Sequence, residues 1–364
     1  MAKRVGVDKW LFGIVLMLVL FGLVEVFSAS AVMAQSRYGS ASIIVVKQMG
    51  WAAVGLVVFI VLMQVPYRFY NQPKVIFTLM AVTTLLLIAV YGMHDSHHTH
   101  RWIRFGGFFT FQPSEIAKPV LVLFLAWFLQ TRIHMMDNLR QTIVPAVLPT
   151  LFFVVLILGE PDLGTAVVCV ATAALMLYLA GAQMRYFGIG ALCSIPVLYL
   201  LLFRVAWRRA RMLAFVNPEA DPRGTGFHIL QSLIAVGTGG FHGLGLMEGR
   251  QKLFYLPEPH TDFIFANVCE ELGIIGAIFV IGLFVALGYR GLRAAILSTD
   301  PFARFVAFGL TSALLIQAFF NISVVLALLP TKGIPLPFIS AGGTSIVFTL
   351  ASMGILLNIT REID

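Results

Sequence analysis

The chain has 364 residues, of which 59% are hydrophobic and only 12% are charged, and its net charge is +8 at pH 7. This composition excludes an ordinary soluble domain and indicates an integral membrane protein. All three cysteines fall inside apolar segments, so the sequence offers neither a disulfide framework nor a CxxC metal site. The positive charge suits anionic lipid or a phosphorylated substrate, and no nucleic-acid motif accompanies it.

Apolar segments of about 18 to 26 residues recur along the chain, which is the length that a helix needs to cross a hydrocarbon core of about 30 Å. No repeat, low-complexity tract or soluble domain interrupts them. We therefore predict a single all-α polytopic membrane domain over residues 1–364, with ten transmembrane helices. The predicted helices are 11–33, 43–64, 75–93, 114–131, 142–159, 163–180, 184–203, 263–288, 302–328 and 339–360.

Lysine and arginine set the predicted orientation of these helices. Most of them fall in the connections on the side of the N-terminus, so the positive-inside rule places both termini in the cytoplasm. The exception is residues 204–262, which we predict to form a large extracytoplasmic loop between the seventh and eighth helices. A loop of this length is translocated whatever its charge. Its arginines therefore need a local explanation.

Polar residues concentrate in four places that this topology puts on one side of the membrane. They are residues 94–115, 159–165, the large loop and 328–343. A single outward-facing site requires such an arrangement.

The end of the large loop, LPEPHTD, carries Glu258, His260 and Asp262 directly into the eighth apolar segment. An ionisable group at the mouth of a membrane helix is costly to keep there and marks a candidate functional site. Partial desolvation raises the proton affinity of a carboxylate, which suits Asp262 to act as a general base. The alternative role for Asp262 is to cap a helix that begins at Phe263. His260 and Glu258 either bind a metal or hold the loop.

Two pairs of residues precede or open the fourth helix. Glu115 and Lys118 lie three residues apart, so they share one helical face and can pair. Such a pair either locks helices together or lines a substrate cavity. In the preceding loop, Arg101 and Trp102 are candidates for binding pyrophosphate and a sugar face. Alternatively, they form an interfacial belt in which Trp and a snorkelling arginine anchor the loop.

Carboxylates and histidines raise the possibility of a metal site. Glu160 and Asp162 sit in a short outer connection, where they either hold Mg²⁺ or Mn²⁺ through oxygen ligands or cap the sixth helix, the role favoured for Asp162. Four histidines cluster before Arg101 and could bind metal adventitiously; they are His94, His97, His98 and His100.

Further cations occur in the large loop and before the last helix. Arg208 belongs to an arginine-rich segment that we predict to lie on the membrane with its cations toward lipid phosphates. Lys332 and Ser340 stand in a Pro- and Gly-rich re-entry, where irregular backbone is tolerated only if it is buried or lines a cavity. Lys332 is a candidate phosphate ligand, and the alternative is a snorkelling lysine beside a helix contact made by small residues. We also predict that Ser340, Arg208 and His260 bind substrate.

Five segments resemble, in order and spacing, the signature blocks of the SEDS family (shape, elongation, division and sporulation proteins) of bacterial cell-wall glycosyltransferases. The resemblance covers nearly the whole chain. The segments are RWIRFG…FQPSEIAK, GEPDLGTA, FVNPEADPRGTGFHILQSLIAVGTGGFHGLG, LPEPHTDFIFANVCEELGIIG and NISVVLALLPTKGIPLPFISAGGTS.

The resemblance implies a ten-span enzyme of the cytoplasmic (inner) membrane that polymerises lipid II into a nascent glycan strand on the outer face. It further implies that Asp262 is the essential residue, that the Glu115–Lys118 pair lines the substrate cavity and that Lys332 binds phosphate. A class B penicillin-binding protein would crosslink the product. Thr331 and Lys332 resemble the division member more than the elongation member, which implies a role at the septum with other division proteins. The His94–His100 stretch, Pro259 and Ala341 depart from the family pattern.

The chemistry of this reaction can be compared with the residues directly. A sugar hydroxyl attacks an anomeric carbon whose leaving group is a lipid pyrophosphate, so the site needs a base, cations and an apolar surface. We expect Asp262 as base and a divalent cation, Mg²⁺ or Mn²⁺, held by Asp262, Glu160 and Asp162. A lipid II flippase is an alternative, although the polar residues gather on the outer face and the two halves show no symmetry. A non-catalytic division scaffold would leave Asp262 unexplained.

Overall fold

The computed structural model describes residues 6–92, 101–105 and 109–362. The histidine cluster at 94 to 100, a predicted site of adventitious metal binding, lies outside these residues. The first helices are α1 (Lys9–Tyr38), α2 (Ile43–Gln64), α3 (Pro73–Tyr91), α4 (Pro113–Gln130), α5 (Val144–Gly159) and α6 (Leu163–Leu179). The remaining ones are α7 (Met184–Phe203), α8 (Ala206–Val216), α9 (Phe227–Gly239), α10 (Ile264–Leu297), α11 (Pro301–Val325) and α12 (Gly343–Thr360).

Each of the ten predicted apolar segments coincides with a helix, so the prediction of an all-α fold is confirmed for the described part of the chain. Eight helical segments in that part are long and apolar enough to cross a membrane, and the chain is a multi-pass membrane protein. One of these, Leu139–Gly159, joins a π-helical turn over Leu139–Ile143 to α5. α6 is apolar but has only 17 residues.

Short elements that hydropathy did not predict connect the helices. Strands β1 (Ile103–Phe105) and β2 (Phe109–Phe111) pair antiparallel, with Ile103 opposite Phe111. The other short elements are 3-10 turns at Tyr67–Phe69, Ile133–Met135 and Pro218–Ala220. The hairpin begins two residues after Arg101 and leads directly into α4, so it fixes where Arg101 enters the bundle.

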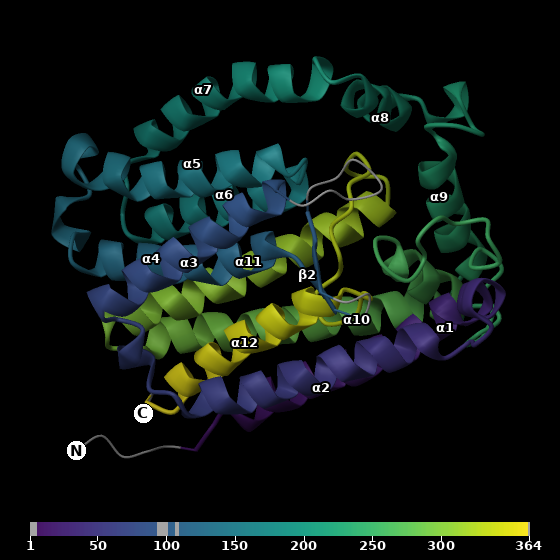
Figure 1. Ribbon diagram of the computed structural model, residues 1–364, viewed down its shortest axis with the longest axis horizontal. Coiled ribbons are helices and arrows are strands. Elements are labelled where there is room, and N and C mark those ends of the chain that lie inside the picture. Colours follow the sequence, from purple (N-terminus) through teal and green to yellow (C-terminus); the bar gives the residue numbers. More distant parts are fainter. Residues whose placement is uncertain (1–5, 93–100, 106–108, 363–364) are drawn as a thin grey trace.

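The centre of the bundle is formed by α4 and α11. α4 is buried throughout Val120–Ala126 and packs against α3, α6 and α11, while α12 packs against α2. In contrast, no residue of α7 is buried, and Figure 1 shows it along one side of the bundle, beyond α5 and α6. α8 continues from α7 across one end of the bundle toward α9. The predicted loop 204–262 therefore contains two helices, α8 and α9.

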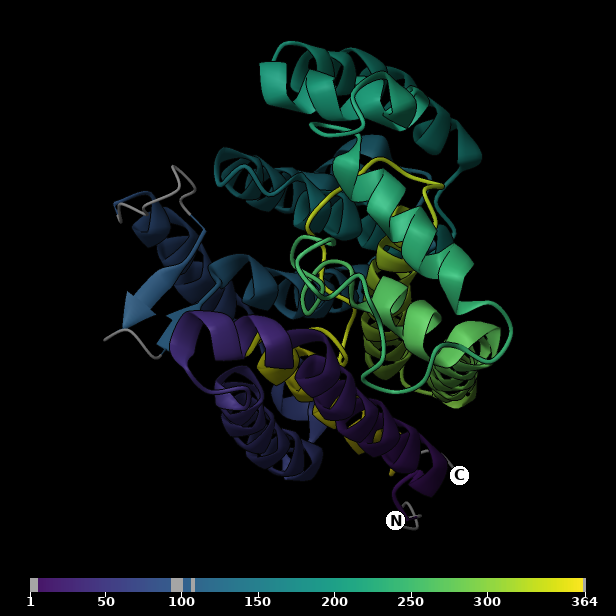
Figure 2. The same cartoon turned by 90° about the vertical axis from the view of Figure 1, so that its right-hand side faces the viewer.

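The start of α1 and the end of α12 lie together at the end of the bundle opposite to α9 (Figure 1). There, Arg290 of α10 donates to Asp8 (Nε to Oδ2, 2.8 Å), the residue that caps α1. Figure 2 views the bundle from the α9 end, where the segments that precede α10 and α12 lie near the centre, with α1, α8 and α9 around them. These two segments carry Asp262 and Lys332.

Candidate active site

A cavity of about 500 Å³ brings together five of the predicted site residues. It is lined by side chains from five separate parts of the chain. The charged residues among them are Arg101, Asp162, Arg208, Arg211, Asp262 and Lys332. Four cations against two carboxylates make this cavity suited to an anionic ligand.

Asp262 enters the cavity from the segment directly before α10. Helix α10 begins at Ile264, and the residue in its N-cap position, Phe263, makes no side-chain cap hydrogen bond. The capping role considered for Asp262 is therefore not observed. Asn321 of α11 donates to the Asp262 carbonyl (2.9 Å) and fixes the backbone. A Cβ at Gly333 would lie 2.8 Å from Asp262 Oδ2, so any larger residue there would displace the carboxylate.

The environment of Asp262 suits a general base. Burial raises the pKa of Asp262 to about 6 because desolvation disfavours the charged carboxylate, and the neighbouring Glu258 acts in the same direction. The guanidinium groups of Arg101 and Arg211 oppose this rise, while Asp162 adds weakly to it. A carboxylate with this pKa is mostly ionised at neutral pH yet accepts a proton more readily than an exposed one.

The arginines are aimed by their local structure. Arg101 donates from Nε to the Glu160 carbonyl (2.9 Å) and from its terminal nitrogen to the Pro161 carbonyl. Arg208 and Arg211, three residues apart on α8, share one face. Each guanidinium carbon lies 5.0 Å from the centre of the Trp207 ring. Stacking on the ring favours an extended orientation of these side chains.

Arg211 was not predicted as a site residue, although the arginine run in the sequence included it. The signal that could have identified it is its spacing of three from Arg208.

Lys332 completes the set of cations. Its pKa is lowered to about 8, mainly because burial disfavours the ammonium and also because Arg208 lies close.

The two carboxylates of the α5–α6 connection have different roles. Asp162 caps α6, as favoured from the sequence: Oδ1 accepts from the Thr165 amide (3.1 Å) and Oδ2 from the Thr165 hydroxyl (2.8 Å). Glu160 is fully buried, does not line the cavity and has no hydrogen-bond partner for either carboxylate oxygen. Burial raises its pKa to about 9, with a further contribution from Asp162. A neutral, buried carboxyl group that does not face the cavity is a poor metal ligand, so Glu160 does not suit the predicted metal site.

Within the described residues, no three or more His, Cys, Asp or Glu side chains converge as a metal-binding group. Asp162 and Asp262 are the carboxylates that reach the cavity. Two carboxylates would suffice for a Mg²⁺ ion that keeps several waters, because such an ion needs few protein ligands.

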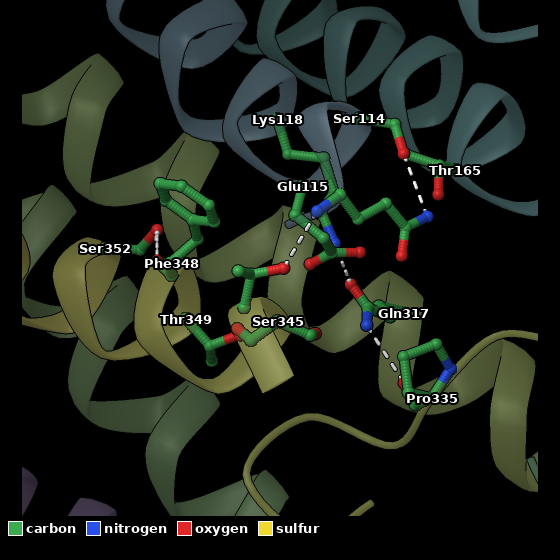
Figure 3. Close-up of polar contacts among 12 residues, drawn as sticks. Ser114, Glu115, Lys118, Thr165, Gln317, Pro335, Ser345, Phe348, Thr349 and Ser352 are labelled. Carbon is green, nitrogen blue, oxygen red and sulfur yellow. Dashed lines mark hydrogen bonds and ion pairs between the residues drawn. The ribbon is translucent and has the colours of Figure 1, made fainter. Parts of the chain in front are cut away.

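The predicted pairing of Glu115 with Lys118 is confirmed at 2.8 Å. Figure 3 shows that Gln317 of α11 extends this pair. Lys118 Nζ donates to Gln317 Oε1 (2.6 Å), and Gln317 Nε2 donates to the Pro335 carbonyl (2.9 Å). The group lines a second, smaller cavity with Thr349. It joins α4 and α11 to the re-entry that carries Lys332, so it supports the first cavity without lining it.

Three further predicted residues lie beside the cavity without lining it: Trp102, His260 and Ser340. Ser340 Oγ donates to the Thr261 carbonyl (2.6 Å) and accepts from the Leu336 amide (2.8 Å). The His260 carbonyl accepts from the Ala341 amide (2.8 Å). His260 and Ser340 therefore fasten the segment before α10 to the segment before α12, directly beside Asp262. The contact of Ser340 joins residues 79 apart in the chain, which no spacing rule predicts.

Comparisons with known proteins identify the family of the chain. The model of the cell cycle protein family of FtsW, RodA and SpoVE matches residues 8–364. The chain belongs to this family. A probable peptidoglycan glycosyltransferase FtsW of Geobacter metallireducens is 42% identical over 343 residues, which cover 94% of this chain and 91% of the relative. The stage V sporulation protein E of Bacillus subtilis is 38% identical over 360 residues, which cover 99% of this chain and 98% of the relative.

Solved structures share the fold. The rod shape determining protein RodA of Thermus thermophilus superposes with a TM-score of 0.72 at 25% identity, over 99% of this chain and 98% of RodA. A chain from a structure described as "Structural coordination of polymerization and crosslinking by a peptidoglycan synthase complex" reaches a TM-score of 0.80 at 25% identity, over 98% of each chain. The sequence-based identification of a SEDS-type protein is thus confirmed.

Proposed function

We infer that this chain is a peptidoglycan glycosyltransferase that extends glycan strands from lipid II in septal cell-wall synthesis. Its family membership and relatives called peptidoglycan glycosyltransferases support this function. The observation that links this function to particular residues is the placement of Asp262 in a cavity with Arg101, Arg211 and Lys332. The direct test is polymerisation of labelled lipid II by the purified full-length protein, with and without a class B penicillin-binding protein.

The proposed reaction uses Asp262 as base. The acceptor sugar hydroxyl gives its proton to an Asp262 carboxylate oxygen while its oxygen bonds to the anomeric carbon of the donor. The bond from that carbon to the pyrophosphate oxygen breaks, and both of its electrons leave with the undecaprenyl diphosphate. Glu258 and the burial of Asp262 favour proton acceptance, since both raise the pKa of this carboxyl group.

The cations of the cavity act on the leaving group. Negative charge develops on the pyrophosphate as the bond breaks, so preorganised positive groups lower the barrier more than they stabilise bound substrate. Arg101, Arg208 and Arg211 offer planar donor pairs suited to phosphate oxygens, and Lys332 offers a point charge. A divalent cation bound with the pyrophosphate beside Asp162 and Asp262 would add Lewis-acid stabilisation.

The membrane arrangement is part of the proposal. We propose ten membrane spans, which are the eight segments long and apolar enough to cross a membrane together with α4 and α6. Both termini are cytoplasmic, residues 204–262 are extracytoplasmic, and the cavity faces outward in the cytoplasmic membrane at the division septum. The positive-inside pattern of the sequence supports this orientation. Burial of Glu115 and Lys118 as a pair suits a position inside the membrane, where an unpaired charge is costly.

The proposed partners are membrane lipids, other division proteins and an FtsI-type class B penicillin-binding protein. The similar structure described as a peptidoglycan synthase complex, in which polymerisation and crosslinking are coordinated, supports the last of these. A crosslinking partner would act on the strand as it leaves the polymerase.

Replacement of Lys332 tests the leaving-group cations. Lys332→Ala should lower polymerisation about tenfold to hundredfold, because charge would develop on the pyrophosphate with one counterion fewer. Lys332→Arg keeps the charge and should retain more activity than the alanine variant. The rate of strand formation from labelled lipid II measures both, and wild-type rates in the alanine variant would remove Lys332 from the site.

The pH dependence of the rate should be bell-shaped. Below a pH of about 6 Asp262 becomes protonated and can no longer accept the acceptor proton, so the rate should fall about tenfold per pH unit. Above a pH of about 8 Lys332 loses its proton and the rate should fall again. Initial rates from pH 4.5 to 9.5 measure both limbs. In Lys332→Arg the alkaline limb should disappear, and its persistence would assign that limb to another group.

A further inference from the structure

Helix α10 is interrupted inside the bundle. Gly273 has φ +65° and ψ −159°, which is not helical, so α10 consists of a short half-helix, 264–272, and a longer one, 274–297. Backbone groups around the interruption bond instead to residues 240–245, the segment that follows α9. These bonds are Ile274 N to Gly240 O (3.0 Å), Ile275 N to Phe241 O (3.4 Å), Leu244 N to Glu270 O (3.0 Å) and Gly245 N to Glu271 O (3.0 Å).

Glycines make this backbone pairing possible. A Cβ at Gly239 would lie 1.8 Å from the Cys269 carbonyl oxygen, and one at Gly243 would lie 2.1 Å from the Glu271 carbonyl oxygen. Gly243 also has φ +80°, a conformation that other residues rarely adopt. Gly239 and Gly243 therefore allow the segment after α9 to pack closely against α10.

Two side chains of the half-helix 264–272, Glu270 and Glu271, hold the residues that follow this segment. Glu271 is fully buried and accepts from Lys252 Nζ (2.7 Å), from Ser28 Oγ of α1 (2.6 Å) and from the Met247 amide (2.9 Å). Lys252 is also buried and lies 3.1 Å from the same serine hydroxyl. Removal of Lys252 would leave a buried carboxylate without its counterion, which is strongly unfavourable.

Glu270 adds a second attachment through backbone amides. Its Oε1 accepts from the Arg250 amide (2.8 Å) and from the Gln251 amide (3.2 Å). Together, Glu270, Glu271 and Lys252 bind the segment 244–252 to the inner end of the half-helix 264–272. We call this group the α10 clamp.

The clamp lies at one end of the half-helix and Asp262 lies just beyond the other. A helix this short does not hold its own direction in isolation, because nucleation is costly and few internal hydrogen bonds form. Its direction therefore depends on its neighbours, among them the groups that fix the interruption. We propose that Lys252 and Glu271 are positioning residues that orient the half-helix 264–272 and thereby hold Asp262 against Gly333 in the cavity. This proposal rests on the proposed role of Asp262 as base.

The test compares two ion pairs of the same helix. Lys252→Met breaks the clamp, whereas Arg290→Met breaks the pair of α10 with Asp8 at the opposite end of the bundle. Both variants are measured as full-length protein in proteoliposomes with labelled lipid II. We expect Lys252→Met to lower kcat about tenfold to hundredfold, since a small misplacement of a reacting group costs this much, while KM changes less than about twofold. Arg290→Met should leave both parameters within about twofold, and Lys252→Arg should restore most of the activity.

A further measurement separates positioning from a loss of folded protein. Hydrogen exchange at the amides of Leu244, Gly245 and Ile274 should become faster in this variant and not in Arg290→Met.

The outcomes distinguish a failure of the positioning role from a failure of the proposed role of Asp262 as base. A wild-type kcat in Lys252→Met, or an equal loss of kcat in Lys252→Met and Arg290→Met with unchanged hydrogen exchange at the clamp, would overturn the positioning role. If Asp262→Asn is inactive at the same time, only that role is lost and the proposed function stands. If Asp262→Asn polymerises at the wild-type rate, the proposed base is overturned, and the positioning role with it.

Discussion

Glycan polymerisation by the Asp262→Asn variant should fall at least about 10²-fold, because the amide keeps the size of the side chain but cannot accept the acceptor proton. Asp262 makes no cap bond to α10, so the substitution removes no helix contact. Folding, measured by monodispersity in detergent and by thermal unfolding, should therefore change little. The rate of strand formation from labelled lipid II gives the effect directly.

Glu258 provides a matched control for this result. Its exposed carboxylate lies four residues before Asp262 and does not line the cavity. Glu258→Gln should keep most of the activity and should move the acid limb of the pH–rate profile to lower pH, because one cause of the raised pKa of Asp262 is removed. Wild-type strand yield from Asp262→Asn would instead revive the interpretation of the chain as a lipid II flippase.

The helices could be predicted from the sequence because hydropathy reports directly on the membrane. The predicted segments 43–64 and 184–203 coincide with α2 and α7 to the residue. The prediction was poorer where a helix extends beyond the apolar core. α10 continues to Leu297 rather than 288, and the extension carries Arg290, which pairs with Asp8. α12 begins at Gly343 rather than 339 because the preceding Pro-rich residues form the re-entry.

Arrangements that depend on long-range contacts could not be predicted. The interruption at Gly273 is invisible to hydropathy, since both half-helices are apolar and the partner segment 240–245 is bonded through its backbone. Glu160 illustrates the same limit within the site. Its position next to Asp162 in the sequence suggested a shared role, yet one carboxylate faces the cavity and the other is buried without a partner. Only the turn between α5 and α6 decides which way each side chain points.

The charges of the site were predictable as a set because the positive-inside pattern assigned the four polar segments to one side of the membrane. Their individual roles were less so. Ser340 was predicted to bind substrate and instead bonds the Thr261 carbonyl, while Arg211, which was not predicted, lines the cavity. Residue type and membrane side indicate which residues gather at an end of the bundle. Side-chain direction, which depends on the surrounding packing, determines which of them reach the ligand.

Removal of divalent cations should stop polymerisation, and Mg²⁺ or Mn²⁺ should restore it. The pyrophosphate leaving group carries more negative charge than the cavity neutralises, since four cations there are offset in part by Asp162 and Asp262. A divalent cation held by Asp162 and Asp262 would supply the remaining positive charge as a Lewis acid. Strand formation in EDTA, followed by addition of each metal, measures this dependence.

Variants of the two carboxylates of the α5–α6 connection locate the cation. Asp162→Asn should raise the Mg²⁺ concentration needed for half-maximal rate, because one anionic oxygen at the cavity is lost. Glu160→Gln should leave that concentration unchanged, since this carboxyl group is buried and its pKa of about 9 keeps it neutral at pH 7. Replacement of the four histidines at 94 to 100 by alanine should also have no effect. Undiminished activity in EDTA would assign charge stabilisation entirely to Arg101, Arg208, Arg211 and Lys332, whereas a metal response lost with the histidines would place the cation in their loop.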